Sequence, residues 1–205
     1  MARSKTYSQQ AECFDPEQRY SLEDAVAILQ KMPHVKFDET VELAVRLGID
    51  PRQSDQNVRG AMSLPNGTGK QTTVVVIAAD EAAEAAREAG ADHVGFEELL
   101  DKIQDGWLDF DVMIATPAAM QKVRTLGRVL GPRGLMPNPK TGTVTDDTAA
   151  AVEQAKAGRI EYRADKGGCA HVPIGKVSFE PAAIVENAEA VVQALIRARP
   201  AATKG

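Results

Sequence analysis

The middle of the chain contains two short runs of apolar residues, and these runs constrain the fold more than any other feature. The first is Thr72-Thr-Val-Val-Val-Ile-Ala-Ala79, and the second is Asp111-Val-Met-Ile-Ala115. Continuous apolar runs of this length are typical of strands that are covered on both faces, as in a parallel sheet. Helical patterns and one short strand near His93 lie between the runs and after them. Strands that alternate with helices at this spacing predict a small open α/β sheet of Rossmann-like outline.

The helices expected in this block begin at polar or proline residues. We expect Asp80 to cap a helix that ends near Ala89, and Thr145 or Asp146 to cap a helix that ends at Ala157. Two more helices are expected over 96–103 and 117–126.

The sequence on either side of this block has a period of two instead. Apolar and polar residues alternate over 41–49 and over 159–165, which predicts strands with one buried face. A third strand is expected over 58–64, with an interruption near Gly60, and a further extended segment over 171–179. Helices are expected over 22–31, after the cap Ser21, and over 181–196, and residues 1–19 are expected to form a loose arm.

The return of the alternating pattern after the α/β block predicts a divided outer domain. We expect residues 1–66 and 158–205 to form one discontinuous α+β domain, and residues 67–157 to form an inserted three-layer α/β domain. Leu64-Pro-Asn-Gly-Thr-Gly69 has the composition of a linker between them.

Neither composition nor motif spacing supports catalysis. Gly67-Thr-Gly-Lys70 lacks the first glycine and the final Ser or Thr of a Walker A phosphate loop. The two cysteines are isolated and the histidines share no metal-ligand spacing, so we expect no metal and no cofactor. No apolar run approaches the roughly 20 residues that span a bilayer, so no membrane partner is expected. An enzyme that holds a phosphate-bearing ligand on the inner sheet remains the alternative from another class.

A stretch rich in glycine and proline, from Gly127 to Gly142, includes three cations, Arg128, Arg133 and Lys140. Because proline fixes φ and glycine permits positive φ, this stretch cannot form an ordinary helix or a central strand. The window 112–145 contains no Asp or Glu, although the whole chain has a net charge of −5. This local reversal of sign favours an anionic partner such as a phosphate backbone. The alternative is that the Gly/Pro stretch is a structural connection and that its cations pair with acidic residues on the domain surface.

The segment Gly-Arg-Val-Leu-Gly-Pro-Arg-Gly-Leu-Met-Pro-Asn-Pro-Lys-Thr-Gly-Thr-Val-Thr, residues 127–145, closely resembles the signature of the bacterial ribosomal protein L-one family, of the large subunit's mobile side stalk. The resemblance extends from about Tyr20 to the end of the chain. It includes Lys36-Phe-Asp-Glu-Thr-Val-Glu42, Arg46-Leu-Gly-Ile-Asp-Pro-Arg52, Leu64-Pro-Asn-Gly-Thr-Gly-Lys70, Gly106-Trp-Leu-Asp-Phe-Asp111 and His171-Val-Pro-Ile-Gly-Lys-Val-Ser-Phe179.

The resemblance implies two domains joined by a two-stranded hinge, with RNA binding by the outer domain. The positions that match the family's RNA site are Lys36, Phe37, Thr40, Glu42, Asp165, Lys166, Gly167 and His171. Further candidates for phosphate contacts follow from the alternation of polar and apolar residues in the strands: Arg46, Arg52, Arg59 and Arg163. The alternatives are that Phe37 belongs to the core and that Glu42 only pairs with Arg46. A second contact with RNA or transfer RNA is expected on the Gly/Pro stretch, at Arg128, Arg133, Met136 and Lys140.

In function, the resemblance implies a non-enzymatic, cytoplasmic constituent of the large ribosomal subunit. Its expected partners are large-subunit rRNA at the stalk, transfer RNA at the exit site, other ribosomal proteins and the protein's own messenger RNA. It would assist release of deacylated transfer RNA and repress translation of its own operon; a repressor that acts off the ribosome is a further alternative. The family continues into another strand and a Met-Gly-containing segment, whereas this sequence stops at Gly205. We expect the sequence to be incomplete, because losing a sheet strand would expose an edge.

Overall fold

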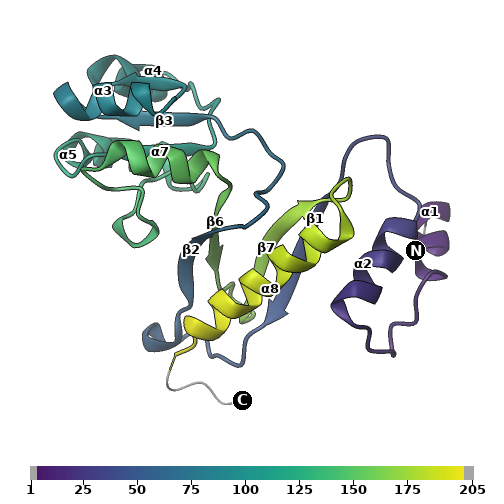
Figure 1. Cartoon of the computed structure of the whole chain (residues 1–205). Helices are drawn as coiled ribbons and strands as arrows, with labels where there is room; N and C mark the ends of the chain where they lie inside the picture. Colours follow the sequence, from purple (N-terminus) through teal and green to yellow (C-terminus); the bar gives the residue numbers. More distant parts are fainter. Residues whose placement is uncertain (1–3, 201–205) are drawn as a thin grey trace. The chain divides into compact units, whose positions relative to one another are not determined.

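A computed structural model describes residues 4–200, which group into two compact units (Figure 1). The first unit comprises the residues up to Val58, Leu64–Gly69 and the residues from Arg163 onward; the second comprises Arg59–Ser63 and Lys70–Tyr162. The chain mixes helices and strands, so the expected α/β class is confirmed. The exact domain boundaries and the hinge stay predictions. Residues 1–3 and 201–205 lie outside the described residues.

The first unit is built on an antiparallel pair of strands. Its elements are α1 (Lys5–Ala11), α2 (Leu22–Lys31), β1 (Thr40–Arg46), η1 (Ser54–Gln56), β7 (Cys169–Lys176) and α8 (Pro181–Arg197). β1 pairs with β7, with Leu43 opposite Val172 and Ala44 opposite His171. Because side chains alternate across a strand, Leu43 and Val172 lie on one face of the pair and Ala44 and His171 on the other.

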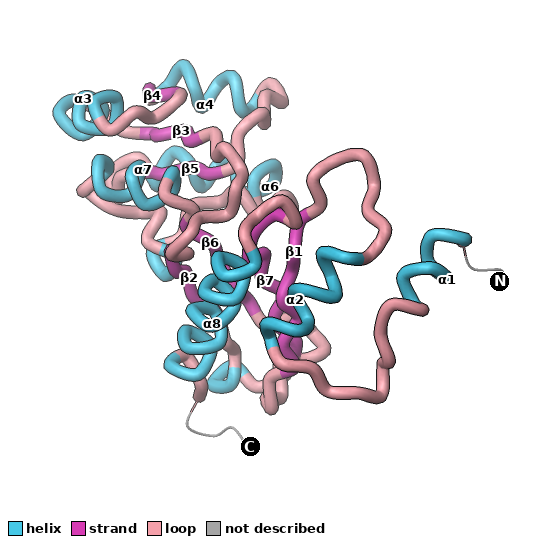
Figure 2. The backbone as a smooth tube through the Cα atoms, turned by 45° about the vertical axis from the view of Figure 1, so that its right-hand side comes forward, coloured by secondary structure: helices cyan, strands magenta, loops and turns pink. Residues whose placement is uncertain are grey.

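The long helix α8 covers the apolar face of this strand pair (Figures 1 and 2). Its apolar positions predict this packing, since Ile184, Ala188, Val191 and Leu195 recur at helical spacing and are all buried. α2 packs on α8 in turn. Ser21 caps α2 as expected, because its Oγ accepts a hydrogen bond from the Asp24 N–H at 3.1 Å.

A buried asparagine in α8 joins three segments of the first unit. The side chain of Asn187, which has no exposed surface, accepts from the Asn66 N–H at 3.0 Å. It also donates to the carbonyl oxygens of Gly67 at 3.1 Å and Ile174 at 2.7 Å. The 64–69 segment is thereby fixed to α8 and β7.

The second unit contains a three-stranded parallel sheet in the order β4-β3-β5. Its elements are β2 (Arg59–Ser63), β3 (Val74–Ile77), α3 (Asp80–Glu88), β4 (His93–Gly95), α4 (Glu97–Gln104), β5 (Val112–Ala115), α5 (Met120–Val123), η2 (Arg124–Leu126), α6 (Gly127–Leu130), η3 (Pro139–Thr141), α7 (Thr148–Lys156) and β6 (Arg159–Arg163), whose last residue belongs to the first unit. β2 pairs with β6.

Both faces of the parallel sheet are covered, as the uninterrupted apolar runs predict. Val75 and Ile77 pack with residues of α4, α5 and α6, whereas Val74 and Val76 pack with residues of α3 and α7. All four valine and isoleucine side chains of β3 are completely buried. The second unit therefore has three layers, a sheet between two layers of helices.

Several local expectations were wrong. The residues before 20 include the helix α1, whose cap is Ser4, rather than forming only a loose arm. α3 has Ala79 as its N-cap, and Asp80 is its first residue with a φ of 49°. Asp147, not Thr145 or Asp146, caps α7 by accepting from the Ala150 N–H at 3.1 Å.

The strand near Gly60 and the helix before Gly127 also differ from expectation. β2 is not interrupted at Gly60; a Cβ there would lie 2.5 Å from the Tyr162 Oη, so glycine makes room for that ring. The helix expected over 117–126 is divided into α5, η2 and α6, and it continues into the Gly/Pro stretch as far as Leu130. Gly127 is accommodated because its φ of −56° is helical.

Candidate nucleic-acid interface

One face of the β1–β7 pair is open to solvent and carries polar side chains. Thr40, Glu42, Ala44 and Arg46 on β1 are exposed, and so is His171 on β7. We call these five residues the open face. The alternating pattern of β1 creates the open face, since its apolar residues point toward α8.

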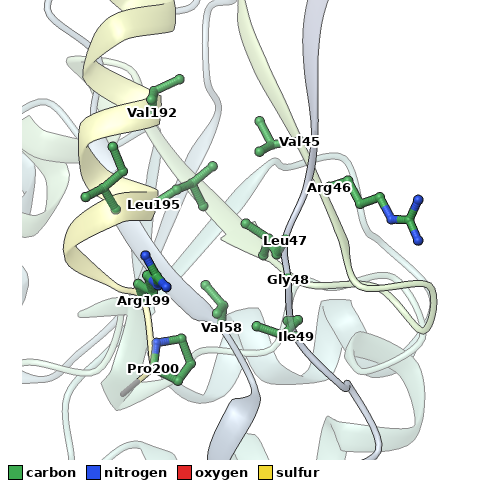
Figure 3. Close-up of a pocket in the computed structure, with 11 residues that line it drawn as sticks. Val45, Arg46, Leu47, Gly48, Ile49, Val58, Val192, Leu195, Arg199 and Pro200 are labelled. Carbon is green, nitrogen blue, oxygen red and sulfur yellow. The ribbon is translucent and has the colours of Figure 1, made fainter. Parts of the chain in front are cut away.

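Figure 3 shows this alternation at the end of β1. Val45 and Leu47 point into an apolar groove of about 200 Å³, which Val192 and Leu195 of α8 also line. The Arg46 side chain points away from the groove, so its guanidinium lies on the open face. No ion pair joins Arg46 to Glu42 within the described part of the chain, which removes the alternative that Glu42 serves only as its partner.

The loop that connects α2 to β1, residues 33–39, carries Lys36 and Phe37 and leads directly into Thr40 of this face. Phe37 is 71% exposed, the largest exposed fraction among the exposed large apolar side chains of residues 4–200. The alternative that Phe37 is a core residue is therefore wrong. An exposed aromatic ring next to a lysine is suited to stacking on a base or sugar while the cation meets a phosphate.

Several hydrogen bonds hold the 33–39 loop to the end of β7. Asp38 accepts from the Ser178 N–H at 3.2 Å and from the Ser178 hydroxyl at 2.7 Å. The Lys176 Nζ donates to the Asp38 carbonyl at 3.4 Å and to the Thr40 Oγ1 at 2.8 Å. The segment 171–179 resembles the family, but Lys176 was not among the site residues predicted from the sequence. Its position opposite Thr40 in the β1–β7 register would have revealed it, and that register is not readable from the sequence.

A tight turn at the start of β7 carries three more predicted site residues, Asp165, Lys166 and Gly167, all exposed. The Asp165 Oδ1 accepts from the Gly167 N–H at 2.8 Å and from the Cys169 N–H at 2.7 Å. The hydrogen bond from the Cys169 N–H is the main cause that lowers the pKa of the Asp165 carboxyl, and a small desolvation effect opposes it. The other oxygen of Asp165 lies 3.9 Å from the His171 Nε2. The structure thus connects the turn to the open face through His171.

The predicted arginines outside this group are placed differently. Arg52 follows β1 in an exposed turn, and Arg163 is exposed at the end of β6. Arg59 belongs to the second unit, where its guanidinium lies 3.4 Å from the Glu161 carboxylate. The structure therefore places the 33–39 loop and the 165–167 turn at the two ends of the β1–β7 pair that carries the open face, whereas Arg59 belongs to the other unit.

The Gly/Pro stretch in the second unit is an ordered loop around Asn138. The Asn138 carbonyl accepts from the N–H groups of Thr141 at 3.2 Å and Thr143 at 3.3 Å, and its side chain accepts from the Lys140 N–H at 2.8 Å. Gly142 has a φ of 67° and lies against the Arg159 guanidinium, where a Cβ would come within 2.6 Å. The positive φ therefore favours glycine at this position, while the end of the Arg159 side chain could move aside.

Arg128 on α6 and Arg133 and Lys140 on the loop are exposed, and we call these three residues the loop cations. None of the three forms an ion pair with any residue of 4–200. This observation does not support the alternative that they only neutralise the acidic surface. Met136, the fourth residue predicted here, is half-buried and packs against the apolar core beneath the sheet.

No group of three or more histidine, cysteine or carboxylate side chains within residues 4–200 is arranged to hold a metal ion. The search for a membrane-spanning helix in the same residues also found none.

Comparison with known proteins agrees with this arrangement. Residues 29–205 match the family described as the ribosomal protein L1p/L10e family. The chain belongs to that family. Among its relatives, the large ribosomal subunit protein uL1 of Saccharophagus degradans is 60% identical over 191 residues, which cover 93% of this chain and 83% of the relative. The protein of the same name from Limosilactobacillus fermentum is 54% identical over 203 residues, covering 99% of this chain and 88% of the relative.

Membership of the L1p/L10e family identifies the chain as a structural constituent of the large ribosomal subunit, which acts in the cytoplasm as part of the ribosome. It is not an enzyme, so the alternative of a phosphate-ligand enzyme is wrong. Ribosomal RNA and other ribosomal proteins are its partners in the subunit.

Proposed function

We propose that the open face, the 33–39 loop and the 165–167 turn together bind large-subunit rRNA at the mobile side stalk. The observation that carries this proposal is the 71% exposed Phe37 ring, on a loop that leads into the open face and is hydrogen-bonded to Ser178 after the end of β7. An exposed aromatic side chain in water has no stabilising role in the fold, whereas it can stack on a base or sugar of RNA.

Each kind of side chain in this group has a proposed role. Lys36, Arg46 and Lys166 contact phosphates and thereby position the RNA. Thr40 and Glu42 form hydrogen bonds with 2′-hydroxyls or base edges, which distinguish RNA from DNA. Since the residues sit on paired strands and a hydrogen-bonded loop, the RNA meets a preshaped surface. Arg52, Arg163 and Arg59 are proposed as peripheral phosphate contacts.

The test is the affinity of the purified chain for a stalk RNA fragment, measured at several salt concentrations. We expect Phe37→Ala and Lys36→Ala each to weaken binding by roughly 1–3 kcal/mol. Lys36→Ala should also reduce the salt slope by about 1, because one phosphate contact is lost. Val35→Ala is the matched control, since Val35 is an exposed apolar residue of the same loop with no aromatic ring. Wild-type affinity in both test variants would remove these residues from the site.

We further propose that the loop cations make a second contact, with transfer RNA at the exit site or with rRNA, and that this contact assists release of deacylated transfer RNA. Their exposure and their lack of acidic partners among residues 4–200 support this role. Replacing all three by alanine should slow transfer RNA release from reconstituted subunits while leaving stalk RNA affinity within about twofold, because that site is on the other unit.

Finally, we propose that the RNA site represses translation of the protein's own operon by binding a similar RNA shape in the message. In a cell-free translation assay, Phe37→Ala should relieve repression by the same factor by which it weakens stalk RNA binding. Repression that is unchanged in this variant would contradict the shared site.

A further inference from the structure

His34 lies between two hydrogen-bond acceptors at the base of the 33–39 loop. Its Nδ1 is 2.7 Å from the Glu39 Oε2, and its Nε2 is 3.3 Å from the Gln30 carbonyl oxygen. Neither acceptor can supply a proton at neutral pH. A neutral imidazole has a single N–H, so it satisfies one of these partners, whereas the imidazolium donates to both.

The two partners belong to opposite ends of the loop. Gln30 is in the last turn of α2, and Glu39 immediately precedes β1. The protonated ring therefore closes the loop at its base, with Lys36 and Phe37 on the segment between. The Gln30 side chain also donates to the carbonyl oxygens of Val177 at 3.2 Å and Phe179 at 2.9 Å, so the α2 end of the closure is fixed to the residues after β7.

We propose that protonated His34 is a positioning residue that holds Lys36 and Phe37 in place for RNA, so that RNA affinity falls as His34 loses its proton. This inference rests on the proposed function. His34 does not contact the RNA itself in this account; it acts through the shape of the loop.

The charged groups around the ring agree with this role. Glu39 is the titratable side chain that faces the ring, while α2 contributes only the carbonyl oxygens of Leu29 and Gln30. The hydrogen bond with Glu39 is the largest cause that raises the pKa of His34 above its ordinary value of 6.5. Because the pKa is raised in the folded state, the closure is complete below pH 6.5 and is lost as the pH rises through the raised value.

The experiment compares two chains that differ only at His34, and both carry His171→Gln so that the histidine of the open face is absent from both. One has His34 and the other has His34→Gln, a neutral side chain of similar reach. Their affinity for the stalk RNA fragment is measured from pH 6 to pH 8.5 at constant ionic strength. With His34 present, we expect affinity to fall on the order of two- to fivefold, as for an exposed ion pair; with His34→Gln it should stay flat. The same fall in both chains would overturn the proposal.

A second measurement separates this proposal from the proposed function. Nuclear magnetic resonance titration of the RNA-free protein should give a His34 pKa above 6.5, and the Phe37 amide signal should shift with the same midpoint. Glu39→Gln should lower that midpoint. If the Phe37 amide signal does not shift as His34 titrates, the proposed closure of the loop by His34 is wrong, even if RNA binds. Failure of the wild-type chain to bind the RNA at any pH would instead overturn the proposed function, and the titration would then decide the closure alone.

Discussion

Replacing the buried Asn187 by alanine should loosen the first unit without affecting the second. The substitution removes the acceptor for the Asn66 N–H and the donor for the carbonyl oxygens of Gly67 and Ile174. Each intramolecular hydrogen bond contributes about 1 kcal/mol net, and a partner left buried without a bond costs more. Three lost bonds at a residue with no exposed surface therefore predict a destabilisation of about 2–4 kcal/mol.

Hydrogen exchange detected by mass spectrometry suits this prediction, because it reports the two units separately. Amides of α8 and β7 that exchange through global unfolding of the first unit should exchange on the order of a hundredfold faster, since 1.4 kcal/mol corresponds to a factor of ten. Peptides from β3 and β5 should be unchanged. Asn66→Ala is the matched control: it removes only exposed side-chain bonds and keeps the backbone N–H that Asn187 accepts. Equal exchange in Asn187→Ala and Asn66→Ala would refute the reasoning.

Two further predictions concern the turn and the Gly/Pro loop. Asp165→Ala should lower the Tm at pH 7, because the carboxylate no longer accepts from Gly167 and Cys169. Since the folded-state pKa of Asp165 is lowered, its contribution is present above about pH 3.8 and is lost as the pH falls through the lower folded value; in thermal melts the difference from wild type should thus be smaller at pH 3 than at pH 7. Gly142→Ala should destabilise the second unit by about 1–3 kcal/mol, because alanine disfavours a φ of 67°. Urea unfolding followed by Trp107 fluorescence measures it, and an unchanged midpoint would contradict the need for glycine there.

The strands could be predicted where the number of faces that helices cover determines the order of apolar and polar residues. Val74 to Ile77 are apolar without interruption because helices cover both faces of β3, and β1 alternates because α8 covers only one of its faces. Helix ends were less predictable. Thr145, Asp146 and Asp147 are three adjacent residues that can all cap a helix, and the choice among them depends on how α7 meets the sheet.

The candidate site was predictable in its residue types but not in its contacts. The segment Lys36 to Glu42 was selected through its resemblance to a family, and the sequence alone left open a core position for Phe37, where an aromatic residue at a helix–strand junction usually lies. The bonds that shape the loop join Asp38 to Ser178 and Lys176 to Thr40, pairs more than 130 positions apart in the chain. Such contacts depend on the register of β1 against β7, which no local pattern specifies. The two acceptors around His34 are likewise visible only once α2 and β1 are placed.

The most direct test of the proposed RNA site is to locate the stalk RNA on the protein. Chemical-shift changes in the isotope-labelled chain, recorded while unlabelled stalk RNA is added, report this residue by residue. The account predicts the largest changes over 33–46 and 165–173, with α3 and α4 unaffected. The proposed RNA site would be contradicted if the chemical-shift changes were concentrated in α3, α4 or the apolar groove beside α8 and the signals of Phe37 and His171 did not change.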